Sequence, residues 1–378
     1  MSAWPGKYVI GLTGNIATGK SVVRKMFEHL GAMGIDADAL THRAIAQGAP
    51  GYQAVIDTFG KWVVGSDGQI DRSRLARLVF SDPQALERLE AIVHPLVRQA
   101  VDVLIRRSTR RVIVLEAIKL LESPLRKGCD VICVTYAPKE VQLARLMQKR
   151  GMTPEVARQR IAAQPPQEEK LAAADVVIRN DGSFEDTWRQ VVEAWQKFTP
   201  AAPAPAQERI VEVPSTKVVV ERGRPQDAAD IAGFINQVSH GLRNLKRADI
   251  MAAFGEKAYL LLRLNKSLVG VVGWQVENLV ARTNEVYLDH SVQVGNAMAE
   301  AMKEVEQNSK DLQCEVSLLF LTPHLARQEE VWKNLGYEIR TIKSLGVRAW
   351  QEAAQESMPK GTVLLFKQLR KDRVLRPV

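Results

Sequence analysis

Eight residues near the start of the chain have the spacing G-x-x-x-x-G-K-[ST] of a phosphate-binding loop. They follow an apolar run over 8–12 that predicts a buried parallel strand, and they precede an amphipathic helix predicted over 21–30. In such a loop, backbone N–H groups surround the β-phosphate, and the lysine reaches the β- and γ-oxygens. A chance match in a glycine-rich turn is the alternative, and the flanking strand and helix argue against it.

The motif therefore predicts binding of a nucleoside triphosphate with Mg²⁺, and it does not specify a reaction. Lys20 is the predicted catalytic cation, and the hydroxyl of Ser21 is the predicted metal ligand. The predicted nucleotide contacts in this segment are Gly14, Asn15, Ile16, Ala17, Thr18, Gly19, Lys20, Ser21 and Val22.

A kinase also needs a group that takes the proton from the acceptor hydroxyl, and carboxylates near strand ends are the candidates. Asp36 and Asp38 follow the first helix by a short turn, and their alternation predicts that one of them faces the loop. The alternative is that both cap a helix beginning near Ala39. Glu116, at the end of a predicted strand, either holds the water shell of Mg²⁺ or is a surface carboxylate.

Several cations follow in the sequence, as a site that transfers a phosphoryl group requires. We expect two or three of them to contact phosphate and the others to lie on solvated helix faces. His94-Pro95 is interpreted as the end of a helical run, where a histidine alone indicates a cap or a core position. The candidate cations are Arg145, Lys149, Arg150, Arg158, Arg160 and Lys170.

The pattern of apolar runs and helical segments before residue 199 predicts an α/β fold, with a parallel sheet covered on both faces. Ligands are then expected at the carboxyl ends of the strands. Thr153 and Pro154 predict the start of a short, Arg-rich helix of the kind that forms a lid. Strands are predicted over 8–13, 112–115, 131–135 and 176–178, and helices near 21–30, 83–106, 139–149, 154–164 and 184–198.

A Pro/Ala-rich stretch over 199–207 predicts an extended linker, 199–215, between domains over 1–198 and 216–378. The second domain has the pattern of an α+β fold with a mostly antiparallel sheet. Its strands are predicted over 218–221, 259–264, 269–275, 285–288, 316–321, 337–342 and 362–366, and its helices over 227–238, 247–254, 295–307 and 325–335.

Composition limits the class of protein. The net charge of +9 suits anionic ligands such as nucleotides, but the basic residues are interspersed with acids, which argues against nucleic acid as a partner. No stretch reaches the 18 or so apolar residues that a membrane span needs, and the first residues do not resemble a signal peptide, so we expect a cytoplasmic protein. Cys129, Cys133 and Cys314 lack paired spacing and are interpreted as reduced core thiols.

Taken together, the motifs of the first half resemble bacterial dephospho-CoA kinase over residues 8 to about 198. This resemblance implies a P-loop kinase with a helical lid. It also implies that the chain transfers the γ-phosphate of ATP, with Mg²⁺, to the ribose 3′-hydroxyl of dephospho-CoA. The segments that carry it are Gly11-Leu12-Thr13-Gly14, Lys20-Ser21, Ile35-Asp36-Ala37-Asp38, His94-Pro95-Leu96, Gln164, Ala174-Asp175 and Ile178-Arg179-Asn180-Asp181-Gly182.

The same resemblance assigns roles to single residues. It implies that Asp38 is the base, that His94 lines the acceptor site and that 150–170 is a lid over the phosphates. It further implies that Arg145 faces the nucleotide, and that Asn180 and Gly182 belong to a loop against the adenine.

Some residues depart from the family pattern. Lys119 stands where the family has a proline, and it is a further candidate for contact with the acceptor's phosphates. Asn15 and Ala17 replace glycines, and Val22 replaces a threonine, but none of these changes affects the Gly-Lys-Ser core of the loop.

Residues 216 to about 370 resemble the GNAT acyltransferase fold in the order of their elements and in the segment 331–338. The resemblance implies a CoA or acyl-CoA site at the loop 292–297, where Gly295 and Ala297 fit the family pattern. Val292 and the nearby Asp289 do not fit it, so four roles stay open: acyl transfer, CoA binding alone, sensing of the kinase's product, and docking to the first domain. His290, His324 and Tyr337 are either acid–base groups or packing residues.

Two other functions remain open at this point. The first is another small-molecule P-loop kinase, which acts on a nucleoside or nucleotide. The second is a nucleotide-binding regulator whose second domain binds CoA or transfers an acyl group, and only the Lys119 segment supports it.

Overall fold

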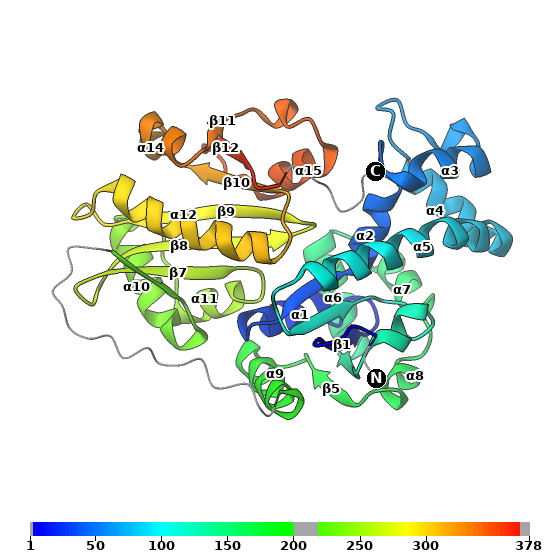
Figure 1. Ribbon diagram of the computed structural model, residues 1–378. Coiled ribbons are helices and arrows are strands. Elements are labelled where there is room, and N and C mark those ends of the chain that lie inside the picture. Colours follow the sequence, from blue (N-terminus) through cyan, green and yellow to red (C-terminus); the bar gives the residue numbers. More distant parts are fainter. Residues whose placement is uncertain (1–2, 200–217, 371–378) are drawn as a thin grey trace.

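The computed structural model describes residues 3–199 and 218–370, so the predicted linker lies outside the described residues except for Thr199. Each half of the described chain is built around a sheet of its own, and the two halves lie against each other (Figure 1). Both fold classes predicted from the sequence, α/β for the first half and α+β for the second, are confirmed.

The first half contains a five-stranded parallel sheet in the order β2-β3-β1-β4-β5. All five strands point the same way, so their carboxyl ends, where ligands collect in such sheets, share one edge. The strands are β1 (Tyr8–Thr13), β2 (Met33–Asp36), β3 (Val112–Glu116), β4 (Val131–Tyr136) and β5 (Val176–Arg179).

Helices cover both faces of this sheet. The side chains of α1 and α9 pack with one face of the strands, and those of α2 to α5 pack with the other, because alternate residues of each strand point to opposite faces. The helices are α1 (Lys20–His29), α2 (Ala37–Ala44), α3 (Pro50–Phe59), α4 (Arg72–Ser81), α5 (Pro83–Arg107), α6 (Lys139–Arg150), α7 (Pro154–Ala162), α8 (Gln167–Ala172) and α9 (Phe184–Phe198).

Some expectations for the first half were wrong. Pro95 does not end a helix: it lies on an exposed position inside α5, which continues for 12 residues beyond it. A proline removes one hydrogen bond of the helix, and the packing of the apolar side of α5 on the core compensates for that loss. The sequence also did not predict β2, α3, α4 or α8.

The second half contains a seven-stranded sheet in the order β11-β12-β10-β9-β8-β7-β6, in which only β9 and β10 pair in parallel. The strands are β6 (Val219–Arg222), β7 (Ala258–Leu264), β8 (Ser267–Glu277), β9 (Val280–Leu288), β10 (Val316–Leu321), β11 (Glu338–Ile339) and β12 (Val363–Gln368). The helices are α10 (Ala228–Val238), α11 (Arg247–Ala253), α12 (Val294–Asp311), α13 (Pro323–Ala326), α14 (Glu329–Asn334) and α15 (Arg348–Ser357).

Here too the boundaries differ from the predictions. The helix expected over 325–335 is divided into α13 and α14, the strand expected over 337–342 has two residues, and α15 was not predicted. The described cysteines are free thiols, as expected. Across the described ranges, no helix combines the length and the apolar character that a membrane crossing requires.

His29, in the last turn of α1, lies at the contact between the halves. Its Nε2 is 2.7 Å from the carbonyl oxygen of Phe254, and its ring meets the Phe254 ring edge-on. Burial, together with the positive charge of Arg222, lowers the pKa of His29 to about 4. The histidine is therefore neutral in the folded chain at a pH where the unfolded chain already binds a proton.

We expect acid to weaken this contact. The pKa of His29 in the folded chain lies below its value of about 6.5 in the unfolded chain. The free energy of unfolding therefore decreases as the pH falls from 6.5 towards 4, and the loss at pH 5 is about 2 kcal/mol. Urea denaturation at pH 7 and pH 5 should show this loss in the wild type and not in His29→Gln, whose amide donates to the same carbonyl without titrating. An equal pH dependence in both proteins would contradict the assignment.

Candidate active site

The phosphate loop lies between β1 and α1, and its glycines allow the chain to turn closely over neighbouring groups. Gly19 has φ +93°, and a Cβ there would overlap the side-chain amide of Asn180. Gly14 has φ +151°, and a Cβ there would meet the carbonyl oxygen of Thr135 at 2.6 Å. The loop conformation therefore requires glycine at both positions.

Hydrogen bonds from two other elements fix the outer side of the loop. Arg145, on α6, donates to the carbonyl oxygens of Ala17 at 3.1 Å and of Asn180 at 2.7 Å. The amide of Asn180 donates to the carbonyl oxygen of Thr18 at 3.0 Å. Of the residues predicted to contact the nucleotide, Arg145 and Asn180 thus hold the loop itself, whereas Gly182 is exposed beyond β5.

The segment between α7 and α8, which lies within the predicted lid over 150–170, contacts the inner part of the phosphate loop. Gln164 accepts a hydrogen bond from the backbone N–H of Ile16 at 2.7 Å. The side chain of Asn15 donates to the carbonyl oxygen of Pro165 at 2.9 Å. A movement of this segment would therefore free donors of the loop for phosphate oxygens.

Lys20 is buried beneath the loop, where its ammonium donates to the carbonyl oxygen of Asn15 at 3.2 Å. Burial lowers its pKa, and the nearby carboxylates of Glu116, Asp38 and Asp36 act in the opposite direction. The lysine thus lies among the candidate base and metal-site carboxylates, where it can contact the phosphate that is transferred.

Glu116 ends β3 as a buried carboxylate that is 3% exposed, so the alternative of a surface residue is wrong. It accepts a hydrogen bond from the hydroxyl of Ser21 at 3.0 Å and forms an ion pair with Arg24 at 2.7 Å. A hydroxyl and a carboxylate beside a phosphate site are the oxygen ligands and water-shell partners that Mg²⁺ takes with a nucleotide. Ser21 and Glu116 therefore fit the metal.

The two aspartates have different surroundings. Asp36 caps α2, since its side chain accepts from the N–H of Ala39 at 2.9 Å. Asp38 lies in the first turn of α2, where it accepts from the N–H of Ile118 at 3.0 Å. The expectation that both cap a helix is therefore wrong for Asp38. Burial raises the pKa of Asp38, opposed by the Ile118 hydrogen bond and by Lys20.

The predicted acceptor residues lie along α5 and the loop after β3. Lys119 forms an ion pair with Glu90 of α5 at 3.1 Å, and His94 is exposed one helical turn further along α5. The backbone of Ile118, next to Lys119, accepts from Lys170 at 2.7 Å and donates to Asp38. The structure thus brings the Lys119 segment into direct contact with the proposed base.

Other predicted residues lie elsewhere. The side chain of Val22 lies against Gly255 of the second half. A Cβ added to Gly255 would be 3.2 Å from the side chain of Val22. Arg150, Arg158 and Arg160 are exposed. Tyr337 is buried and donates to the Ser317 hydroxyl at 2.9 Å, so it is a packing residue. The other two candidate acid–base groups of the second half, His290 and His324, are exposed.

The sequence reasoning missed Arg24, which links Glu116 to Glu28 through ion pairs of 2.7 Å and 2.5 Å. Its position four residues after Lys20 on α1 is the signal that could have found it, since residues so spaced share one helix face.

Comparisons with known proteins identify the family of the first half. The family model for dephospho-CoA kinase matches residues 8–186. The dephospho-CoA kinase of Geobacter sulfurreducens is 40% identical over 195 residues, which cover 51% of this chain and 99% of the relative. This chain belongs to the dephospho-CoA kinase family. The family likeness spans the first half only.

Solved structures match each half separately. The match to a protein from Thermus thermophilus covers 50% of this chain and 97% of the Thermus chain, with 35% identity and a TM-score of 0.47. An acetyltransferase of the GNAT family from Staphylococcus aureus covers 40% of this chain and 99% of its own, with 12% identity and a TM-score of 0.33.

Proposed function

We propose that this dephospho-CoA kinase family member phosphorylates the ribose 3′-hydroxyl of dephospho-CoA with ATP, giving CoA and ADP. The observation that carries the proposal is the convergence of Lys20, Asp38 and Glu116 beside the phosphate loop, at the carboxyl ends of β1, β2 and β3. The family membership identifies the acceptor class.

In the proposed mechanism, the oxygen of the 3′-hydroxyl forms a bond to the γ-phosphorus, and Asp38 accepts the proton of that hydroxyl. The bond between that phosphorus and the β–γ bridging oxygen breaks, and ADP leaves. Lys20 stabilises the charge that develops on the phosphoryl oxygens. Ser21 and Glu116 would hold the Mg²⁺ that accompanies ATP, and that ion would supply positive charge to the β- and γ-phosphates.

Product analysis tests this function. The full chain is incubated with Mg²⁺ and ATP, and with dephospho-CoA, adenosine, common nucleotides or no acceptor, and ADP and CoA are quantified. ADP that forms only with dephospho-CoA, together with CoA, is the expected result. ADP with a nucleoside instead would favour another small-molecule kinase, and no ADP with any acceptor would favour a nucleotide-binding regulator.

We also propose the domain limits 1–198 and 216–378, a linker over 199–215, and CoA or acyl-CoA as a ligand of the second domain, in a cytoplasmic protein. Gly295 lies at the N-terminus of α12, beside a cavity lined by Ser291, Gln293 and Asn296. Calorimetric titration of the full chain with acetyl-CoA tests the site, and Gly295→Asp should abolish one binding event. Identical isotherms for both proteins would refute it.

A further inference from the structure

A hairpin of the second half reaches into the first half beside the candidate active site. It is formed by β8 and β9, and its turn residues, Asn278 and Leu279, both have positive φ, at +51° and +61°. Such a turn favours Asn and Gly, and a leucine there is strained. The strain is offset because Leu279 packs with the apolar core of the first half.

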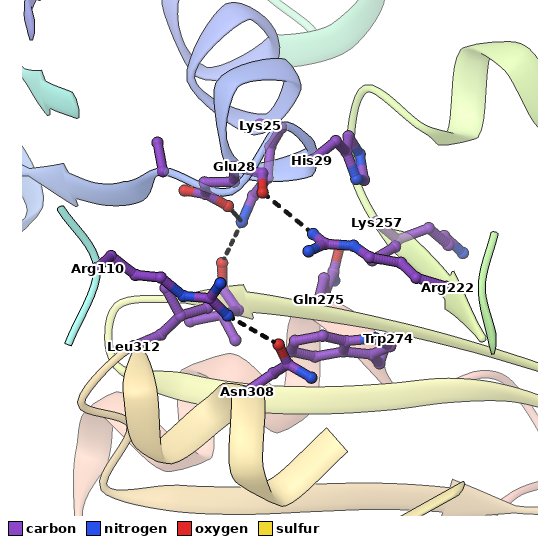
Figure 2. Close-up of a pocket in the computed structure, with 13 residues that line it drawn as sticks. Lys25, Glu28, His29, Arg110, Arg222, Lys257, Trp274, Gln275, Asn308 and Leu312 are labelled. Atoms are coloured by element: carbon purple, nitrogen blue, oxygen red, sulfur yellow. Dashed lines mark hydrogen bonds and ion pairs between the residues drawn. The ribbon is translucent and has the colours of Figure 1, made fainter. Parts of the chain in front are cut away.

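The first contact of the hairpin leads to the phosphate side of the site. The ammonium of Lys25, on α1, donates to the carbonyl oxygen of Val276 at 2.6 Å and forms an ion pair with Glu28 at 2.8 Å. In Figure 2, Arg222 of the second half points towards Glu28, and its guanidinium donates to the carbonyl oxygen of Glu28 at 3.1 Å. Glu28 also forms an ion pair with Arg24, and Arg24 forms a second ion pair with Glu116. Glu116 in turn accepts a hydrogen bond from the hydroxyl of Ser21.

The second contact leads to the base. Arg43, in the last turn of α2, donates to the carbonyl oxygen of Asn278 at 2.6 Å and pairs with Glu315 at 2.5 Å. Glu315 is 1% exposed and its backbone N–H holds the carbonyl oxygen of Leu279. Because α2 is a short rigid helix, Arg43 lies only about 7.5 Å along its axis from Asp38.

The space around the turn does not suit a ligand of substrate size. The cavity between Leu279 and Asp36 has a volume of about 40 Å³, enough for water molecules only. Simple attachment of the halves would need no contact with the residues next to the base and the metal ligand. The hairpin instead contacts the two helices that carry Ser21 and Asp38.

We propose that residues 276–279 at the tip of the β8–β9 hairpin, held by Arg43 with Glu315, are a positioning element of the kinase site. The proposal rests on the proposed function. The tip fixes α2, and thereby Asp38, so the second half is an integral part of the kinase and any displacement of the hairpin changes turnover.

The test uses the full chain. The double variant Arg43→Met with Glu315→Gln leaves no unpaired buried charge, which would otherwise cost about 3–5 kcal/mol. We expect kcat to fall about tenfold while the KM for ATP changes less than about twofold, because the base moves and the nucleotide loop does not. Arg43→Lys with Glu315 intact should recover most of the activity.

Two controls distinguish positioning from general damage. Arg348→Met removes an exposed ion pair with Asp67 that also joins the halves, and it should leave kcat unchanged. When the double variant is made in the Asp38→Asn protein, kcat should fall by less than about twofold relative to Asp38→Asn alone, because the double variant acts through Asp38. An undiminished loss in that background, or an unchanged kcat in the folded double variant, would overturn the proposal.

Hydrogen exchange separates this proposal from the proposed function. Backbone amides over 37–44 should exchange faster in the double variant than in Arg348→Met, whether or not dephospho-CoA is a substrate. Equal exchange would refute the positioning role even in an active kinase. Faster exchange in a chain that makes no CoA would refute the function and leave the coupling of the hairpin to α2 in place.

Discussion

Asp38→Asn is expected to lower kcat for phosphoryl transfer by about 10²–10⁴-fold while Mg²⁺-ATP still binds. Asparagine has the same size, and its carbonyl oxygen can accept the hydrogen bond from the N–H of Ile118, so the loop should keep its structure. It cannot take the proton of the acceptor. ADP release with dephospho-CoA gives kcat, and calorimetry gives the ATP affinity.

Asp36→Asn is the matched control. Asparagine caps a helix as well as aspartate does, so the bond to Ala39 should survive and turnover should stay within about threefold of the wild type. Unchanged turnover in Asp38→Asn would exclude it as the base. A large loss in Asp36→Asn alone would exchange the roles of the two aspartates.

Lys20→Met is expected to lower turnover by about 10²–10³-fold, because in the proposed mechanism Lys20 is the cation that stabilises the transferred phosphoryl group. It should also change the pH dependence. The charge of Lys20 opposes the rise in the pKa of Asp38 that burial causes, so its loss should move the acid limb of kcat/KM to higher pH.

A pH–rate profile of the residual activity measures this shift, and Lys61→Met, at an exposed lysine, is the control that should show neither effect. If Lys20→Met lowered kcat without moving the acid limb, Lys20 would contact phosphate but would not share the electrostatic environment of Asp38.

The sequence predicted the phosphate loop well because one motif specifies its backbone, its charge and its flanking elements. It could not decide between Asp36 and Asp38, since the outcome depended on whether α2 begins at residue 37 or two residues later. Spacing alone leaves such boundaries open. The burial of Glu116 was undecided for a similar reason: Arg24 and Ser21, which hold it, come from a different element.

The contact between the halves could not be predicted. In the sequence, Arg43 resembles an ordinary solvated helix residue. Asn278 and Leu279 resemble a hairpin turn, but only Asn278 is a residue that favours the positive φ that both adopt. The role of these residues depends on contacts between positions more than 200 residues apart, and the periodicity of a single sequence does not reveal such contacts.

The separation of Arg43 from Glu315 has a consequence for synthesis of the chain on the ribosome. The two residues are 272 positions apart, so α2 leaves the ribosome long before its buried counter-charge exists. Domains generally fold in order from the N-terminus as they emerge. The nascent first half therefore folds with α2 unanchored at one end, and α2 acquires its final anchor only after β10 has been made.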